Sequence, residues 1–219
     1  MHRAVVDRFA DRAAAGRALA QLLATHAGRD DVVVLGLPRG GVPVAAEVAG
    51  ALGATLDVLI VRKLGVPTHP ELAMGAIAGV GDGIELVRNE RVLARVQVSD
   101  ADFESVRRRE LAELHRRTAA YRGDRPAAQL AGRRVIVVDD GLATGSTMLA
   151  ALAAVRRLAP SRLIAAVPVG PADCGAALRG LADDIVVAST PTPFQAVRQG
   201  YLDFSETPDE QVLAALAGR

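Results

Sequence analysis

Short runs of aliphatic residues that alternate with helical stretches constrain the fold of this chain more than any other feature. Val32–Leu35 is one such run, and an Ala/Val-rich segment with helical spacing follows it and reaches Leu52. Leu56–Val61 is the next aliphatic run. A strand, a helix and a strand at this spacing predict a βαβ unit and a parallel sheet. Further aliphatic runs lie at 135–138, 162–169 and 184–188. We therefore expect an α/β fold with a central, mainly parallel sheet flanked by helices.

Residues 64–84 break this pattern because they are rich in glycine and proline. The breaking residues are Gly65, Pro67, Pro70, Gly75, Gly79, Gly81 and Gly83. Such residues interrupt long regular elements, and long loops within compact domains often act as lids. We expect a flexible lid loop here, with no more than a short hairpin near 76–86.

Capping residues predict two helices beyond this segment. Ser99 and Asp102 are suited to cap a helix that runs to about Tyr121, and its interspersed Arg and Glu residues predict a solvated surface of mixed charge. Thr207–Glu210 has the pattern of a capping box with a proline at the first helical position, which predicts a final short helix. We expect a single domain over residues 1–219, with a lid or insert at about 64–121 and a small C-terminal hood at about 189–219.

Composition disfavours several classes of protein. The formal net charge is +1 and aromatic residues make up 3% of the chain, so neither electrostatic attraction to nucleic acid nor a base-stacking surface is expected. The single cysteine, Cys174, allows no internal disulfide and belongs to no zinc-binding pattern. No apolar run reaches membrane-spanning length, and the first residues lack a targeting pattern. We expect a cytoplasmic protein with no nucleic-acid or membrane partner.

The segment 139–147 is the strongest functional candidate. An aliphatic strand ends in two carboxylates, Asp139 and Asp140, and a glycine-containing turn then opens into a helix. Backbone N–H groups of such a turn, together with the positive end of the helix, favour a phosphate. The expected phosphate-binding residues are Gly141, Leu142, Ala143, Thr144, Gly145, Ser146 and Thr147. Two adjacent carboxylates can accept hydrogen bonds from vicinal hydroxyls, so the segment predicts a site for ribose 5-phosphate.

Other phosphate-binding motifs do not fit this segment. A Walker A loop requires a lysine directly before the Ser or Thr, and no lysine precedes Ser146 or Thr147. The Gly-x-Gly-x-x-Gly spacing of dinucleotide sites is absent as well. The alternative is a polar turn whose hydroxyls only cap the helix.

The segment Val135-Ile-Val-Val-Asp-Asp-Gly-Leu-Ala-Thr-Gly-Ser-Thr147 resembles the characteristic motif of type I phosphoribosyltransferases. Two further motifs extend the resemblance over about residues 32–170. Gly36-Leu-Pro-Arg-Gly-Gly-Val42 is similar to the family's diphosphate-binding loop, and Arg62-Lys63-Leu-Gly is similar to the start of its flexible loop. These two motifs indicate the family only because the 135–147 motif is present in the same chain.

The resemblance implies a Mg²⁺-dependent glycosyltransferase of nucleotide metabolism with a Rossmann-like fold. It would transfer ribose 5-phosphate from phosphoribosyl diphosphate to a nitrogen nucleophile, such as a nucleobase, and release diphosphate. Arg39 and Lys63 are the expected catalytic cations, and Asp139 and Asp140 would bind the ribose and act on the metal indirectly, through the ribose or water. The expected diphosphate-binding residues are Arg39, Gly40, Gly41, Arg62 and Lys63. Lys63 is the only lysine among 26 basic residues, and a compact ammonium suits a narrow phosphate site. Alone, Arg39 would be interpreted as a surface turn residue and Lys63 as a solvated strand end.

The acceptor is less well specified. Ala143 occupies the loop position at which the 6-oxopurine branch of the family has an aspartate, so a carboxylate acting on a purine from that position is absent. Phe194 and Tyr201, with Phe204, are candidates to stack on a planar acceptor in the hood. The alternative is that the phenylalanines pack against the final helix. His69 and Glu71 lie in the expected lid and are candidates for an acid or base, or for a lid surface.

Two other functions remain open on the same fold. One is a non-catalytic regulator that binds a nucleotide or phosphoribosyl diphosphate, and the other is a hydrolase of the donor. Intact Lys63 and the intact glycine loop favour catalysis, because a sensor of nucleoside monophosphates does not need them. Dimers are common in the family, so a homodimer is one expected assembly.

Overall fold

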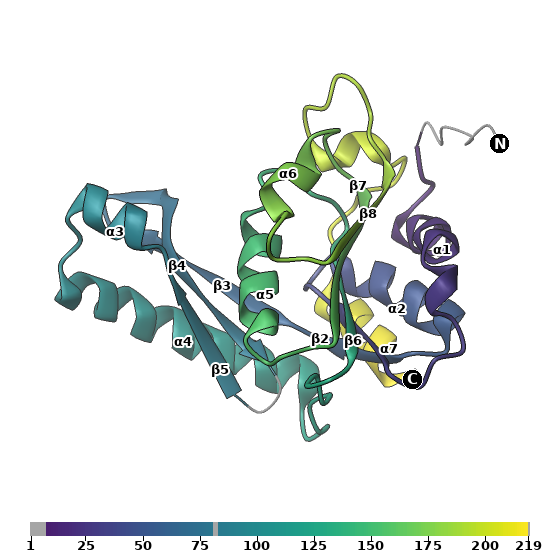
Figure 1. The fold of residues 1–219 in the computed structure, drawn as a ribbon, viewed down its shortest axis with the longest axis horizontal. Coiled ribbons are helices and arrows are strands. Elements are labelled where there is room, and N and C mark those ends of the chain that lie inside the picture. Colours follow the sequence, from purple (N-terminus) through teal and green to yellow (C-terminus); the bar gives the residue numbers. More distant parts are fainter. Residues whose placement is uncertain (1–7, 81–82, 219) are drawn as a thin grey trace.

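The computed structural model describes residues 8–80 and 83–218. Its centre is a five-stranded parallel sheet with the strand order β2-β1-β6-β7-β8 (Figure 1). The strands are β1 (Val32–Gly36), β2 (Thr55–Val58), β6 (Arg134–Val138), β7 (Arg162–Val169) and β8 (Asp184–Ser189). The α/β fold with a central parallel sheet is therefore confirmed.

Alternate residues of the central strands face two separate groups of helices. Val32 and Val34 belong to the hydrophobic cluster that also holds α1, α2 and α7, whereas Val33 and Leu35 belong to the cluster of α5 and α6. These helices are α1 (Arg12–Leu22), α2 (Gly41–Leu52), α5 (Ser146–Arg156), α6 (Cys174–Leu178) and α7 (Asp209–Ala217). Because both faces are covered, the strands are continuous aliphatic runs, as is usual for parallel sheets.

Residues 60–122 form an insert that extends to the left of the central sheet in Figure 1. It contains an antiparallel sheet with the order β3-β4-β5, and two helices. Its elements are β3 (Ile60–Val66), β4 (His69–Val80), β5 (Gly83–Arg88), α3 (Glu90–Val96) and α4 (Asp100–Arg122). The prediction of a loop over 64–84 is therefore wrong: the expected hairpin exists, but it belongs to a regular sheet. Residues 81–82, between β4 and β5 in the sequence, lie outside the described residues.

Packing explains the glycines of this sheet. A Cβ on Gly65 would lie 2.7 Å from the carbonyl oxygen of Pro70, and one on Gly75 would lie 2.7 Å from that of Val87. A Cβ on Gly79 would lie 3.3 Å from Leu114 of α4. These glycines therefore permit close approach between neighbouring segments, which is a recognised role of glycine within strands.

Among the other local predictions, one helix cap is confirmed, whereas a strand and a capping box are wrong. Ser99 caps α4 as predicted, with its side chain accepting a hydrogen bond from the N–H of Asp102. The predicted strand 56–61 is wrong in one respect, because it is divided between β2 and β3 at Leu59, where the chain leaves the central sheet. The capping box is also wrong: Pro208 is the N-cap of α7, without a side-chain hydrogen bond. Cys174 is buried, with 7% of its surface exposed.

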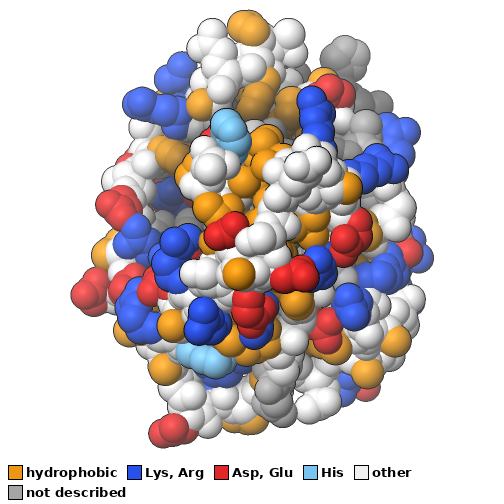
Figure 2. Space-filling view, turned by 90° about the vertical axis from the view of Figure 1, so that its left-hand side faces the viewer, with side chains coloured by type: hydrophobic (Ala, Val, Ile, Leu, Met, Phe, Trp, Pro, Cys, Tyr) orange, Lys and Arg blue, Asp and Glu red, His pale blue; other side chains and the backbone are white. Residues whose placement is uncertain are grey.

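The surface of α4 carries compensating charges. Glu113 accepts hydrogen bonds from Arg116 and Arg117, both at 2.7 Å, and Glu104 pairs with Arg107. Figure 2, a view from the side of the insert, shows blue and red side chains interspersed over this face. The predicted mixed-charge surface is therefore present. Among the described residues, no helix is both long enough and apolar enough to cross a membrane.

Candidate active site

The 139–147 loop connects the end of β6 to the start of α5, at the carboxyl edge of the parallel sheet. The Leu142 N–H donates to the carbonyl of Val169 on β7 at 2.8 Å, and the buried Leu142 side chain fixes the middle of the loop. Gly145 takes φ = 75°, a conformation that favours glycine, immediately before the helix. The loop lines a cavity of about 160 Å³, to which Val197 also contributes. The predicted phosphate-binding residues are thus brought together around one small cavity.

The two carboxylates have different environments. Asp139 lines the cavity, and its Oδ1 accepts a hydrogen bond from the Asp140 N–H at 2.9 Å. The Asp140 carboxylate instead accepts from Arg12 Nε of α1 at 2.9 Å. Burial raises the pKa of Asp139 well above its usual range, and the charge of Asp140 raises it further. Burial also raises the pKa of Asp140, whereas Arg12 opposes this effect. The pair therefore attracts cations and hydroxyl donors.

The glycine loop after β1 packs directly on this acidic pair. β1 and β6 are neighbours, with Gly36 in register with Val138. A Cβ on Gly40 would overlap the Asp140 carboxylate, lying 2.6 Å from its Cγ, and one on Gly41 would lie 2.8 Å from the Asp139 Cα. A side chain at Gly40 would displace the Asp140 carboxylate, and one at Gly41 would displace the backbone at Val138 and Asp139, so only glycine fits at these positions. Motifs separated by about 100 residues in the sequence therefore form one continuous site.

Arg39 is engaged by residues of the C-terminal hood. Its guanidinium forms an ion pair with Glu206, and its Nη1 lies 3.9 Å from Asp209 Oδ1. The Arg39 side chain is 37% exposed and that of Glu206 is 76% exposed. Both partners therefore remain accessible to solvent, and an arriving anion would compete with Glu206 for Arg39.

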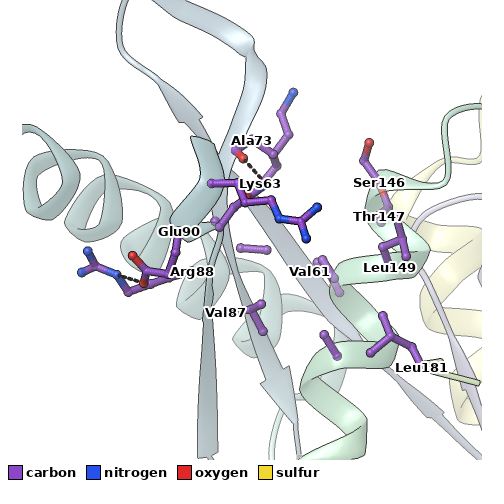
Figure 3. A pocket seen from close by; sticks show the side chains of 16 residues that line it. Val61, Lys63, Ala73, Val87, Arg88, Glu90, Ser146, Thr147, Leu149 and Leu181 are labelled. Carbon is purple, nitrogen blue, oxygen red and sulfur yellow. Dashed lines mark hydrogen bonds and ion pairs between the residues drawn. The ribbon is translucent and has the colours of Figure 1, made fainter. Parts of the chain in front are cut away.

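Arg62 and Lys63 point to opposite sides of β3, as adjacent residues of a strand do. Arg62 donates to Glu110 of α4 at 3.0 and 2.5 Å, so its guanidinium is held against that helix. Lys63 instead lines a cleft shared with Ser146 and Thr147, and Figure 3 shows these residues on facing walls. Lys63 thus faces the phosphate loop across the cleft, whereas the Arg62 guanidinium is held in an ion pair with Glu110.

The predicted acceptor residues do not form an open stacking surface. Tyr201 is 3% exposed, and its hydroxyl donates to the backbone carbonyl of Asp140 at 2.5 Å. It packs against Phe204 at 4.9 Å between ring centroids, and the Arg12 guanidinium lies over the Phe204 ring at 4.2 Å. Phe194 is partly buried in the same cluster. The prediction that Tyr201 stacks on an acceptor is therefore wrong for this conformation, because its ring packs inside the protein and supports the acidic pair.

The expected lid residues, His69 and Glu71, lie at the start of β4, directly after the β3–β4 turn. His69 Nδ1 is 3.3 Å from Glu71 Oε1, and these side chains are 58% and 69% exposed. Lys63 Nζ donates to the backbone carbonyl of Glu71 at 3.3 Å. Nothing in these contacts directs His69 or Glu71 toward the 139–147 loop.

The sequence did not predict three residues of this site. Arg12 pairs with Asp140 across 128 positions, Glu206 reaches Arg39 across 167, and Val197 packs on Gly141. No motif marks them, because arginine and glutamate are common throughout the chain. The glycine at 141 is the one available signal, since it implies that another segment approaches closely.

The acidic pair offers the carboxylates that a metal ion at this site would use. Among the residues that the structure describes, no group of three or more His, Cys, Asp or Glu side chains is arranged to hold a metal ion. Mg²⁺ often binds through one or two carboxylates with the remaining ligands from substrate phosphates and water. Asp139 and Asp140 fit that pattern chemically, with Asp139 facing the cavity.

Comparison with known proteins identifies the family of this chain. The profile of the phosphoribosyl transferase domain matches residues 6–197. Two proteins from Mycobacterium tuberculosis strains, which carry provisional phosphoribosyl transferase names, are 49% identical over 208 residues, or 95% of this chain. The chain spans about half of those relatives, covering 46% of each.

Solved structures resemble this chain in sequence and in fold. The crystal structure of TT1426 from Thermus thermophilus has 46% identity and a TM-score of 0.83, over 96% of this chain and 98% of that one. A hypothetical protein from Neisseria gonorrhoeae, solved with bound ppGpp, has 15% identity and a TM-score of 0.50, over 100% of both chains, which is a likeness of fold alone. This chain belongs to the phosphoribosyl transferase domain family, and its fold is that of type I phosphoribosyltransferases.

Proposed function

We propose that the protein transfers ribose 5-phosphate from phosphoribosyl diphosphate to a nitrogen nucleophile, a nucleobase in the simplest case, and releases diphosphate. One observation carries the proposal: the Gly40–Gly41 turn packs on Asp139 and Asp140, beside the 139–147 cavity. A diphosphate-binding turn, a pair of diol acceptors and a phosphate loop are thereby adjacent. That combination matches the three polar parts of the donor.

In this reaction, a nitrogen lone pair forms a bond to ribose C1 while the bond from C1 to the diphosphate oxygen breaks. The electron pair leaves with diphosphate, and the nucleophile later loses its proton to solvent or to a base. Negative charge grows on the leaving group, so cations and backbone donors aimed there accelerate the reaction. We assign this role to Lys63, to Arg39 once Glu206 has been displaced, and to the N–H group of Gly40. The Gly41 N–H instead donates to the Leu37 carbonyl at 3.0 Å, so Gly41 contributes by letting the turn lie close to Asp139.

The remaining donor contacts follow from the cavity. The 5-phosphate would bind the backbone and hydroxyls of Thr144–Thr147, and the ribose hydroxyls would donate to Asp139 and Asp140. Mg²⁺, when bound, would supply positive charge to the diphosphate and would be held by donor oxygens and, through the ribose or water, by the two carboxylates.

The test is diphosphate release from phosphoribosyl diphosphate and Mg²⁺, measured against a panel of purines, pyrimidines and other nitrogen nucleophiles. Release that requires one acceptor supports the proposal, and release without any acceptor indicates a hydrolase. Lys63→Arg should lower turnover and donor affinity, because a guanidinium does not reproduce a compact ammonium in a narrow site. Unchanged kinetics in that variant would contradict the role of Lys63.

A specific observation favours a second candidate, a non-catalytic sensor of the donor or of a nucleotide. Two of the three cations expected at the diphosphate are paired with carboxylates, Arg39 with Glu206 and Arg62 with Glu110. Calorimetry distinguishes the candidates. Donor binding that is weakened by Asp139→Asn with Asp140→Asn, but without diphosphate release for any acceptor, would identify a sensor.

A further inference from the structure

A second cavity borders the 139–147 loop at Ser146 and Thr147 and extends away from it along α5. It is a cleft of about 550 Å³ between the β3-β4-β5 sheet and α5. Figure 3 shows its two walls, with Val61 and Val87 on the sheet side and Leu149 on the helix. Its volume lies within the range of roughly 300–1,000 Å³ typical of small-molecule sites.

Small side chains create this space. Ala73 and Gly75 line it from β4, and Ala150 and Ala153 line it from α5. Larger residues at these positions would close the gap between sheet and helix. Aliphatic side chains surround the small ones, so the walls suit a flat apolar body such as an aromatic ring system.

Positive charge gathers at the rim of the cleft. Its charged lining residues are Lys63, Arg88, Glu90 and Arg91. Glu90 accepts a hydrogen bond from Arg88 at 3.0 Å, so these two charges compensate each other. Lys63 and Arg91 pair with no carboxylate within the described part of the chain. The uncompensated charge is therefore positive, and an anionic group at the rim would be attracted.

We propose that this cleft is a second ligand site, for a flat apolar molecule that bears one anionic group, such as an aromatic carboxylate. The ring system would lie between β4 and α5, and the carboxylate would meet Arg91 and Lys63 at the rim. This site goes beyond the proposed transfer reaction. Ser146 and Thr147 line both this cleft and the 160 Å³ cavity, so the ligand would lie next to the donor site.

Calorimetry with 2-naphthoate and the full-length chain tests the proposal. No donor is present, so the result is independent of phosphoribosyl transfer. The expected result is one bound naphthoate per chain, with 2-naphthalenemethanol, the uncharged analogue, binding at least fivefold more weakly. Equal binding of the acid and the alcohol would overturn the proposed role of the rim cations.

Two variants locate the bound probe. Ala153→Leu fills the cleft from α5 and should weaken naphthoate binding at least tenfold. Arg91→Gln removes a rim cation and should weaken it about fivefold, while Arg95→Gln, an exposed residue of the same helix that does not line the cleft, should leave it unchanged. Circular dichroism and thermal unfolding verify that each variant is folded.

The outcomes separate the cleft from the donor cavity. Binding that survives Ala153→Leu, or that is equally reduced by Arg91→Gln and Arg95→Gln, would refute the cleft as the site. A second result would also refute the proposal. If the cleft variants bind naphthoate normally and phosphoribosyl diphosphate displaces it, the probe occupies the donor cavity.

Discussion

Arg12 offers the sharpest test of how the acidic pair is supported. Arg12→Met keeps a long apolar side chain but removes the guanidinium that donates to Asp140 at 2.9 Å and to the carbonyl of Ser205 at 2.6 Å. Asp140 would then retain a buried carboxylate without its cation. The two side chains are 13% and 17% exposed, so the pair is largely shielded from solvent.

The magnitude follows from that burial. Removing one partner of a buried ion pair costs ~3–5 kcal/mol, whereas an exposed pair contributes ~0–1 kcal/mol. The Arg12–Asp140 pair is closer to the buried case, but Asp140 can take up a proton in response, so we expect a loss of about 3 kcal/mol in the free energy of unfolding. With a urea slope of ~2–3 kcal/mol/M, the midpoint should fall by roughly 1–1.5 M.

Urea unfolding of Arg12→Met and of a matched control measures this loss. Arg17→Met lies on the same helix, and its pair with Glu47 spans 3.6 Å with side chains that are 60% and 35% exposed. That control should lose less than ~1 kcal/mol. Adding Asp140→Asn to Arg12→Met should recover part of the stability, because it removes the unpaired charge. Equal losses in Arg12→Met and Arg17→Met would refute the reasoning.

Three further predictions concern the same region. Gly141→Ala would place a Cβ 2.7 Å from Val197 Cγ2 and should lower donor affinity, measured by calorimetry, at least tenfold. Adding Val197→Ala should restore part of that affinity, and a double variant without any restoration would contradict the steric explanation. Burial raises the pKa of Asp139 above its ordinary 3.8, so its contribution to stability is present below that pH and is lost as pH rises through the folded-state pKa. Asp139→Asn should therefore raise the urea midpoint at pH 7.5 while weakening donor binding, with the gain vanishing near pH 3.5; a lowered midpoint at pH 7.5 would count against this. Thr207 Oγ1 is buried and has no hydrogen-bond partner among the described residues, so Thr207→Val should stabilise the protein by ~1 kcal/mol, and a destabilised variant would reveal an unseen partner.

The features that the sequence predicts well depend on local chemistry. The central strands follow from continuous aliphatic runs, and the 139–147 loop follows from two carboxylates and glycines placed between a strand and a helix. Each of these signals lies within about ten adjacent residues. Their outcomes differ, however: the fold is confirmed, whereas the donor-binding roles of the loop stay predictions.

The features that the sequence misses depend on contacts between distant segments. The glycines at 65, 75 and 79 suggested a flexible loop, but each allows another segment to pack closely in a regular sheet. The sequence predicted both Arg62 and Lys63 as diphosphate ligands. The pleat of β3 directs their side chains to opposite faces of the strand, and only Lys63 faces the 139–147 loop. Tyr201 looked like an acceptor platform because aromatic residues are scarce, but its hydroxyl satisfies the Asp140 carbonyl.

The contacts around Asp140 also set the order in which a newly made chain acquires its site. Arg12 and Ser205 are 193 residues apart, so the ribosome releases the acidic pair well before the segment that completes its surroundings exists. A nascent chain that stops before Tyr201 has the phosphate loop and Arg12, but it lacks the Tyr201 hydroxyl that donates to the Asp140 carbonyl and the Ser205 carbonyl that accepts from Arg12. Such long-range closure is a late event in folding. Competence to bind the donor should therefore appear abruptly, only after residues 201–209 have been synthesised.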